Sequence, residues 1–94
     1  MAWKVEFSRD SLRFLEKQTS EVQESVKSSL LALLDSLNKN VVPFHLVDIR
    51  RLRRKREGFL RLRTGGVRII FKLQIDTKTL RIYAIGYRGD VYKK

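Results

Sequence analysis

Four arginines near the end of the sequence have side chains suited to binding a phosphate group, and one tyrosine is expected beside them. They are Arg61, Arg63, Arg68, Arg88 and Tyr92. A guanidinium group presents a planar fork of donors that matches a phosphate in two hydrogen bonds. Guanidinium groups also repel one another, so a cluster of them on one face of a sheet indicates an anionic ligand. The alternative is a solvated sheet face whose arginines only keep the strands soluble.

The segment from Val67 to Ile75 is the clearest strand among the elements that must position these residues. Its alternate apolar residues are Val67, Ile69, Phe71, Leu73 and Ile75. The polar residues between them are Arg68, Lys72 and Gln74. A period of two predicts a strand with one apolar face and one polar face.

Two turns connect this strand to its expected neighbours. Residues 60–63 alternate in the same way, and residues 64–66 (Thr-Gly-Gly) supply what a sharp reversal needs. A second turn follows at residues 76–78, after which the apolar face continues through Leu80, Ile82 and Ala84. We therefore predict a three-stranded antiparallel meander with an apolar floor. The opposite face would carry the arginines of residues 61–68, joined by Arg88 and Tyr92 from the segment after the last strand.

The first half of the chain is expected to be a scaffold. Residues 3–7 alternate as a strand, and Ser8 is a suitable N-cap for a short helix that ends near Gln18. Its apolar side would be formed by Leu12, Phe14 and Leu15. Ser20 and Gln23 have capping-box spacing, which predicts that a second helix begins there and continues to residues 38–40. Its apolar stripe, expected to cover the floor of the sheet, is Val22, Val26, Leu30, Leu33, Leu34 and Leu37.

The composition indicates a single α+β domain over residues 1–94, long enough for one modest core. No apolar run approaches the ~20 residues that span a bilayer, and the N-terminus lacks the apolar stretch of a signal peptide. There is no cysteine, and one histidine, His45, cannot build a zinc site by itself. We therefore expect a cytoplasmic protein that uses no metal, no cofactor and no membrane.

The positive charge is concentrated in the second half of the chain. Residues 1–49 contain six basic and seven acidic side chains, a net charge of −1, whereas residues 50–94 contain fifteen and three, a net charge of +12. This asymmetry favours a polyanionic partner, and nucleic acid is the first choice over an acidic protein or an anionic membrane.

The segment between the second helix and the meander contains two further candidates. His45 lies in a predicted connection over residues 41–49 and could act as a general base in RNA cleavage, although a packing role in the loop is the simpler interpretation. A basic run follows, formed by Arg50, Arg51, Arg53, Arg54, Lys55 and Arg56. We expect it to form a basic edge or loop beside the arginine face that attracts RNA phosphates, the alternative being a solvated loop.

The order of these elements and two arginine motifs resemble the RelE/ParE superfamily of bacterial and archaeal toxins. The residues that match are Arg61, Arg63 and Arg68 in the pattern Arg-x-Arg-x-x-x-x-Arg, and Arg88 with Tyr92 in the pattern Gly-x-Arg-x-x-x-Tyr. The resemblance covers essentially the whole chain. It implies a RelE-like, microbial RNase-like fold, in which helices pack on one face of a sheet formed by the N-terminal strand and the meander.

The resemblance also implies an activity. Such toxins are metal-independent, ribosome-dependent endoribonucleases that cleave mRNA in the A site and are silenced by an acidic, RelB-like antitoxin. The 2′-hydroxyl attacks the adjacent phosphate, giving a 2′,3′-cyclic phosphate and a 5′-hydroxyl. By position, Arg61 and Arg68 would hold the scissile phosphate, Arg88 would assist the leaving oxygen, and Tyr92 would be the general base, with Arg63 in support. A phenol with a reference pKa of about 10 is a poor base, but nearby positive charge favours the phenolate.

Two features leave other functions open. Residue 61 is Arg where some members have Lys, so a proton-transfer role at this position is doubtful, and no catalytic Glu/His pair is visible. One alternative is a ParE-like inhibitor of DNA gyrase that cleaves no RNA. Another is a noncatalytic RNA-binding module, or a degenerate toxin that only binds its antitoxin.

Overall fold

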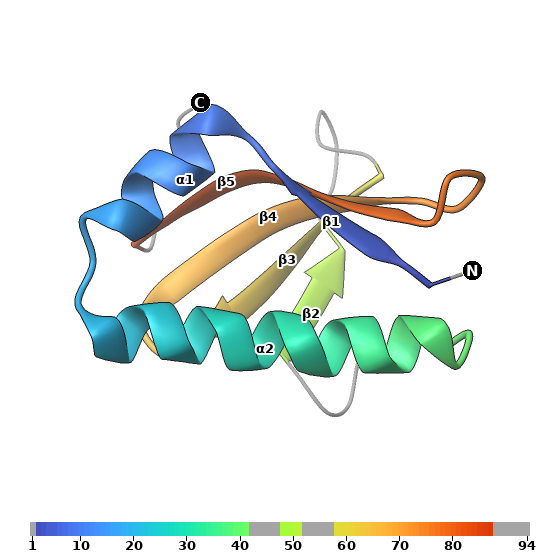
Figure 1. Cartoon of the computed structure of the whole chain (residues 1–94), viewed down its shortest axis with the longest axis horizontal. Coiled ribbons are helices and arrows are strands. Elements are labelled where there is room, and N and C mark those ends of the chain that lie inside the picture. Colours follow the sequence, from blue (N-terminus) through green and yellow to red (C-terminus); the bar gives the residue numbers. More distant parts are fainter. Residues whose placement is uncertain (1, 42–47, 52–57, 88–94) are drawn as a thin grey trace.

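The part of the chain that the structure describes forms seven helices and strands, shown as a computed structural model in Figure 1. The structure describes residues 2–41, 48–51 and 58–87, with only the strand backbone described for residues 48–51. The elements are β1 (Lys4–Phe7), α1 (Arg9–Glu16), α2 (Ser20–Asn38), β2 (Asp48–Arg51), β3 (Phe59–Thr64), β4 (Val67–Gln74) and β5 (Thr79–Tyr87). The α+β class and the helix pair agree with the prediction, as do β3, β4 and β5 of the meander, but β2 pairs antiparallel with β3 and makes the meander four strands rather than three.

The strands form one sheet in the order β1-β5-β4-β3-β2. The three contacts from β2 to β5 are antiparallel, whereas β1 pairs in parallel with β5. Helix α2 crosses one face of this sheet, and α1 lies beside one end of β5 (Figure 1). The opposite face is therefore left without a helix among the described residues.

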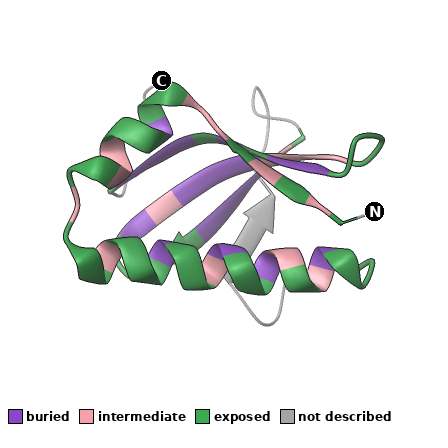
Figure 2. Cartoon of the chain, viewed as in Figure 1, coloured by how far each residue is buried: buried purple, intermediate pink, exposed green. Residues whose placement is uncertain are grey.

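The core lies between α2 and the sheet. The predicted leucine stripe provides its helical side, since Val26, Leu30, Leu33 and Leu37 are at most 5% exposed and Val22 and Leu34 pack against them. Figure 2 shows these buried positions as a purple stripe on the side of α2 that faces the sheet. The strands contribute Leu60, Leu62, Val67, Ile69, Phe71, Leu80, Ile82 and Ile85. Each large aliphatic side chain that is fully buried contributes about 1.5–3 kcal/mol, so this layer fixes the sheet beneath the helix.

Both helices begin at a side-chain cap, but one cap differs from the prediction. Ser8 caps α1 as expected, because its Oγ accepts a hydrogen bond from the backbone N–H of Ser11. Thr19, rather than Ser20, caps α2 and accepts from the N–H of Val22. The expected capping box is absent because Ser20 is the first residue of the helix rather than its cap, and the Gln23 amide donates to the carbonyl of Leu15, in α1.

Several further positions differ from the prediction. Residues 48–51, expected at the junction of a connection and a basic run, form an edge strand. Leu12, predicted on the apolar side of α1, is 46% exposed, and the side chains that pack inward are those of Phe14 and Leu15. Ile75 is 68% exposed because β4 ends at Gln74 and Ile75 opens the turn.

A β-bulge reverses the predicted orientation of one residue in β5. Ile70 pairs with Ala84 and the next residue, Phe71, pairs with Ile82, which leaves Tyr83 as the extra residue. Ile85, not Ala84, therefore enters the core under α2, and Ala84 packs with Ile70 on the other face.

Within the described residues, no helix has the length and apolar character to cross a membrane.

Candidate nucleic-acid interface

Three of the predicted arginines lie on the face of the sheet opposite α2, which we call the arginine face. The antiparallel register sets Arg63 directly opposite Arg68, and Arg61 opposite Ile70. Side chains alternate along a strand, so the burial of Leu60 and Leu62 under α2 directs Arg61 and Arg63 to the other side. The strand geometry thus agrees with the alternation that predicted these three arginines on one face.

The turn between β3 and β4 determines this register. Thr64 pairs with Val67, so only Gly65 and Gly66 connect the strands. Gly65 has φ +60°, a conformation that favours glycine, and its position as the first of two loop residues is typical of a tight hairpin turn. The short loop leaves no room for slippage and keeps Arg63 against Arg68.

The three arginines differ in exposure. Arg61 is only 9% exposed, Arg68 is half-buried and Arg63 is exposed. Burial of Arg61 holds its side chain in place before any ligand arrives and weakens the screening of its charge by water. An anion bound on this face would therefore meet one fixed guanidinium and two more accessible ones.

Two aromatic side chains adjoin these arginines and were not among the predicted site residues. The rings of Phe59 and Tyr83 meet edge to face with centroids 4.7 Å apart. Phe59 also packs against Ile70 and Ala84, which are buried beneath it. The sequence contains one signal for this arrangement. Tyr83 stands where the alternation of inward and outward side chains in β5 breaks, as it does at a β-bulge.

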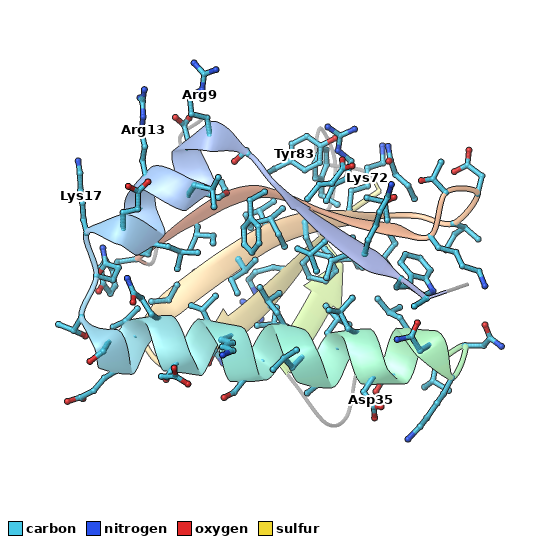
Figure 3. All side chains as sticks on the ribbon, in the orientation of Figure 1. Arg9, Arg13, Lys17, Asp35, Lys72 and Tyr83 are labelled. Atoms are coloured by element: carbon cyan, nitrogen blue, oxygen red, sulfur yellow. The ribbon has the colours of Figure 1, made fainter. Side chains whose placement is uncertain are left out.

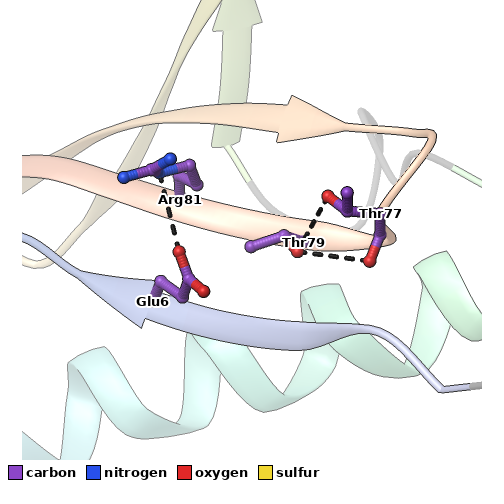
Figure 4. Close-up of polar contacts among 4 residues, drawn as sticks. All are labelled: Glu6, Thr77, Thr79 and Arg81. Atoms are coloured by element: carbon purple, nitrogen blue, oxygen red, sulfur yellow. Dashed lines mark hydrogen bonds and ion pairs between the residues drawn. The ribbon is translucent and has the colours of Figure 1, made fainter.

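Two cations, Lys72 and Arg81, lie near this aromatic pair. The Lys72 Nζ lies 5.4 Å from the centroid of the Phe59 ring. Arg81 forms an ion pair of 3.7 Å with Glu6 of β1, drawn in Figure 4, and both side chains are close to half exposed. Exposed pairs of this kind contribute little to stability, so Arg81 can exchange its partner at small cost.

A hollow of about 330 Å³ lies beside Tyr83 and is lined by Glu6, Phe7, Ser8, Arg81, Ile82 and Tyr83.

A second basic surface lies on α1. Arg9 and Arg13 are four residues apart in the helix, and Lys17 follows at the same spacing as its C-cap. All three are exposed, and Figure 3 shows them projecting on the outer side of α1. The spacing of four was a signal for this ridge, because it places side chains on one helical face.

Other predicted residues have no described side chain. Arg53, Arg54, Lys55, Arg56, Arg88, Tyr92 and His45 lie outside the described residues. Arg50 and Arg51 belong to β2, where the backbone register sets them opposite Arg61 and Leu60. Gly86 pairs with Arg68, so β5 reaches the arginine pair two residues before Arg88. No group of three or more His, Asp or Glu suited to a metal occurs in the part of the chain that the structure describes.

The fold is that of the RelE-type toxins. Superposition on RelE in the archaeal RelE–RelB complex from Pyrococcus horikoshii gives a TM-score of 0.70 at 22% identity, over 95% of this chain and 98% of that one. The isolated RelE toxin of E. coli gives 0.71 at 20% identity over 97% and 92% of the chains. A point mutant of E. coli YafQ gives 0.72 at 15% identity over 96% and 98%.

Sequence assigns the family within this fold. The profile described as the ParE toxin of the type II toxin–antitoxin system, parDE, matches residues 5–92. The chain therefore belongs to the ParE toxin family of the RelE/ParE superfamily. A comparison with curated proteins found no match.

Proposed function

We propose that this toxin is a ribosome-dependent, metal-independent endoribonuclease that cleaves mRNA and so blocks translation. The observation that supports this most is the arrangement of Arg61, Arg63 and Arg68 on one sheet face. Phosphoryl transfer depends chiefly on positioning and on stabilising the charge that develops on the phosphate oxygens. A buried guanidinium with two others beside it provides both.

The roles of individual residues follow from this chemistry and from the superfamily motif. Arg61 and Arg68 bind the nonbridging oxygens of the scissile phosphate, and Arg63 supports them. Arg88 stabilises the leaving 5′-oxygen, and Tyr92 takes the proton of the attacking 2′-hydroxyl. Arg cannot shed its proton in this pH range, so Arg61 acts through charge and hydrogen bonds only. The basic residues between Arg50 and Arg56, together with the ridge on α1, add attraction for RNA phosphates.

A cognate antitoxin is the expected partner. RelE toxins of this fold were solved as complexes with RelB, from Pyrococcus horikoshii, Methanococcus jannaschii and Mycobacterium tuberculosis. For this chain we propose a RelB-like antitoxin with an acidic segment, because the net charge of +11 and the arginine face are complementary to it. An antitoxin bound there would cover the residues that hold the scissile phosphate. We propose that toxin and antitoxin meet in the cytoplasm, where the ribosomes are.

Inhibition of DNA gyrase is the second candidate, and the match to the ParE toxin profile favours it. The two functions are separated by adding the purified protein to ribosomes programmed with mRNA, and separately to gyrase with relaxed plasmid. We expect cleaved mRNA in the first assay and normal supercoiling in the second. Inhibited supercoiling with intact mRNA would replace the nuclease by the gyrase inhibitor.

A variant pair tests whether the arginine face is responsible. Arg68→Ala should lower the rate of mRNA cleavage by ~10²–10³-fold, the usual effect of removing one group that stabilises transition-state charge. Lys27→Ala, which removes an exposed cation from α2, is the control and should cleave at the wild-type rate. Equal loss in both variants would show that only overall charge matters.

A further inference from the structure

Phe59, Ile70, Tyr83 and Ala84 form a small patch on the arginine face, which we call the aromatic platform. Ile70 and Ala84 are 6% and 7% exposed and form its base. Phe59 lies on them and meets the Tyr83 ring edge to face, with centroids 4.7 Å apart and ring planes at 79°. The platform is separate from the main core, which lies on the other side of the sheet.

The Tyr83 ring packs against Phe59 although 41% of the residue is exposed. The bulge makes Tyr83 the extra residue of β5, so that it lies on the same face as its neighbour Ala84. The backbone is held as well, because the Ser8 hydroxyl donates a hydrogen bond of 2.8 Å to the Tyr83 carbonyl. The Tyr83 ring is thus exposed to solvent while the bulge, the contact with Phe59 and the hydrogen bond from Ser8 define its position.

Among the described side chains, the charges around the platform are mostly positive. Lys72 lies over the Phe59 ring, and Figure 3 shows Lys72 and Tyr83 both on the side of the sheet away from α2. Arg81 pairs across β4–β5 with Lys72, and Arg61 is two residues from Phe59, about 7 Å along β3. Glu6 is the one acidic residue among the described strand side chains of this face, and it forms an ion pair with Arg81.

Aromatic faces among cations match the chemistry of a single-stranded nucleic acid. Unpaired bases stack on aromatic rings regardless of sequence, while the flanking cations follow the phosphates. An apolar peptide would match the rings but not the surrounding charges, and a phosphate alone would match the charges but not the rings. An RNA strand matches both.

We propose that Tyr83, supported by Phe59, stacks on an unpaired base of the RNA strand, and that Lys72 binds an adjoining phosphate. This inference rests on the proposed function and adds to it a base-stacking subsite next to Arg61. Because a ring stacks on every base, this subsite gives affinity and placement of the strand with little choice of sequence. It would hold the chain on one side of the scissile phosphate.

Binding of a short RNA in the absence of ribosomes tests the platform. The probe is a single-stranded heptanucleotide with one 2-aminopurine, whose fluorescence falls when the base stacks, and affinity is measured by titration at low salt. Tyr83→Ala should weaken binding roughly 5- to 100-fold and abolish the fluorescence change. Tyr83→Phe keeps the ring and should behave as wild type. Leu31→Ala removes another exposed apolar side chain, 55% exposed on α2, and serves as the control.

The same titration with an abasic residue in place of 2-aminopurine completes the test. Loss of the base should weaken wild-type binding as much as Tyr83→Ala does, and the two changes together should cost no more than either alone. Wild-type affinity and fluorescence in Tyr83→Ala, or no binding by the wild-type protein, would overturn the proposal. So would a loss of affinity in Tyr83→Ala for an acidic antitoxin peptide but not for the RNA.

This experiment and the nuclease assay can fail independently. RNA binding that depends on Tyr83, without mRNA cleavage on ribosomes, would support the platform and refute the nuclease. Normal cleavage by Tyr83→Ala together with unchanged RNA affinity would refute the platform and leave the nuclease intact.

Discussion

Arg63 and Arg68 occupy directly opposite positions across the antiparallel pair of β3 and β4. Side chains at such positions have Cβ atoms about 4.5–5.5 Å apart, and like charges placed there destabilise a sheet. A tight glycine turn and a buried leucine layer nevertheless hold the two strands in this register. Across this register one anion could contact both side chains, which is the arrangement that the proposed function uses.

The number of phosphates that the arginine face neutralises can be measured by salt titration. For a single strand, the logarithm of the binding constant falls with the logarithm of salt concentration by ~0.7 per phosphate contact. Arg63→Ala and Arg68→Ala should each reduce this slope by about 0.7, and the double variant by about 1.4. Lys27→Ala on α2 should leave the slope unchanged, and a wild-type slope in all four variants would remove the arginine face as the RNA contact.

The β3–β4 turn should be sensitive to the identity of one glycine only. Gly65→Val should lower the free energy of unfolding by ~1–2 kcal/mol, because a β-branched residue tolerates φ +60° poorly. Gly65→Asn should lower it less, since Asn visits this region more readily. Gly66→Ala is the matched control, with φ outside this region and room for a Cβ beside the Tyr87 ring. Urea denaturation of the three variants checks the order, and equal losses at 65 and 66 would contradict it.

Ser8 should have two separable roles, as the cap of α1 and as the donor to the Tyr83 carbonyl. Ser8→Ala loses both and should cost about 1 kcal/mol or slightly more of the free energy of unfolding. Ser8→Asp retains a capping acceptor but sets a carboxylate against a carbonyl oxygen, and so should not recover wild-type stability. Ser8→Thr keeps both hydrogen bonds and should be near wild type. Thermal unfolding distinguishes these results, and full recovery by Asp would show that the cap alone matters.

The layer under α2 should dominate stability. Leu33→Ala creates a cavity at a position with no exposure and should cost ~2–5 kcal/mol of the free energy of unfolding. Leu31→Ala, two residues earlier and 55% exposed, should change it by less than ~0.5 kcal/mol. Urea denaturation monitored at Trp3 gives both values, and similar losses would mean that the helix does not pack as described.

The sequence was a good guide where a period runs over many residues. The leucine stripe of α2 and the alternation of β4 each repeat several times, and so they identify which face of each element is buried. The core and the arginine face were therefore both predicted. Local signals failed where a single residue changes the outcome. Ile75 continues the alternation of β4 but opens a turn, and Tyr83 shifts β5 by one position, which moved Ala84 out of the predicted core.

Other features depend on contacts that no local pattern contains. Strand β2 has four residues, of which three are charged, and its pairing with β3 follows from an available edge rather than from its own sequence. Charged residues in a short strand are common at sheet edges. The aromatic platform needs the bulge, the register of β3 and the cap of α1 together, so its residues could not be selected from the chain alone.

The parallel pairing of β1 with β5 joins a strand that is synthesised early with one that is synthesised late. Lys4 lies against Thr79, and Ser8 against the carbonyl of Tyr83, so β1 has no lateral neighbour until β5 has left the exit tunnel. Long-range pairing of this kind forms late. We expect the nascent chain to remain unfolded, and therefore inactive, until β5 has emerged, so that the toxin becomes active only after most of its chain has been made.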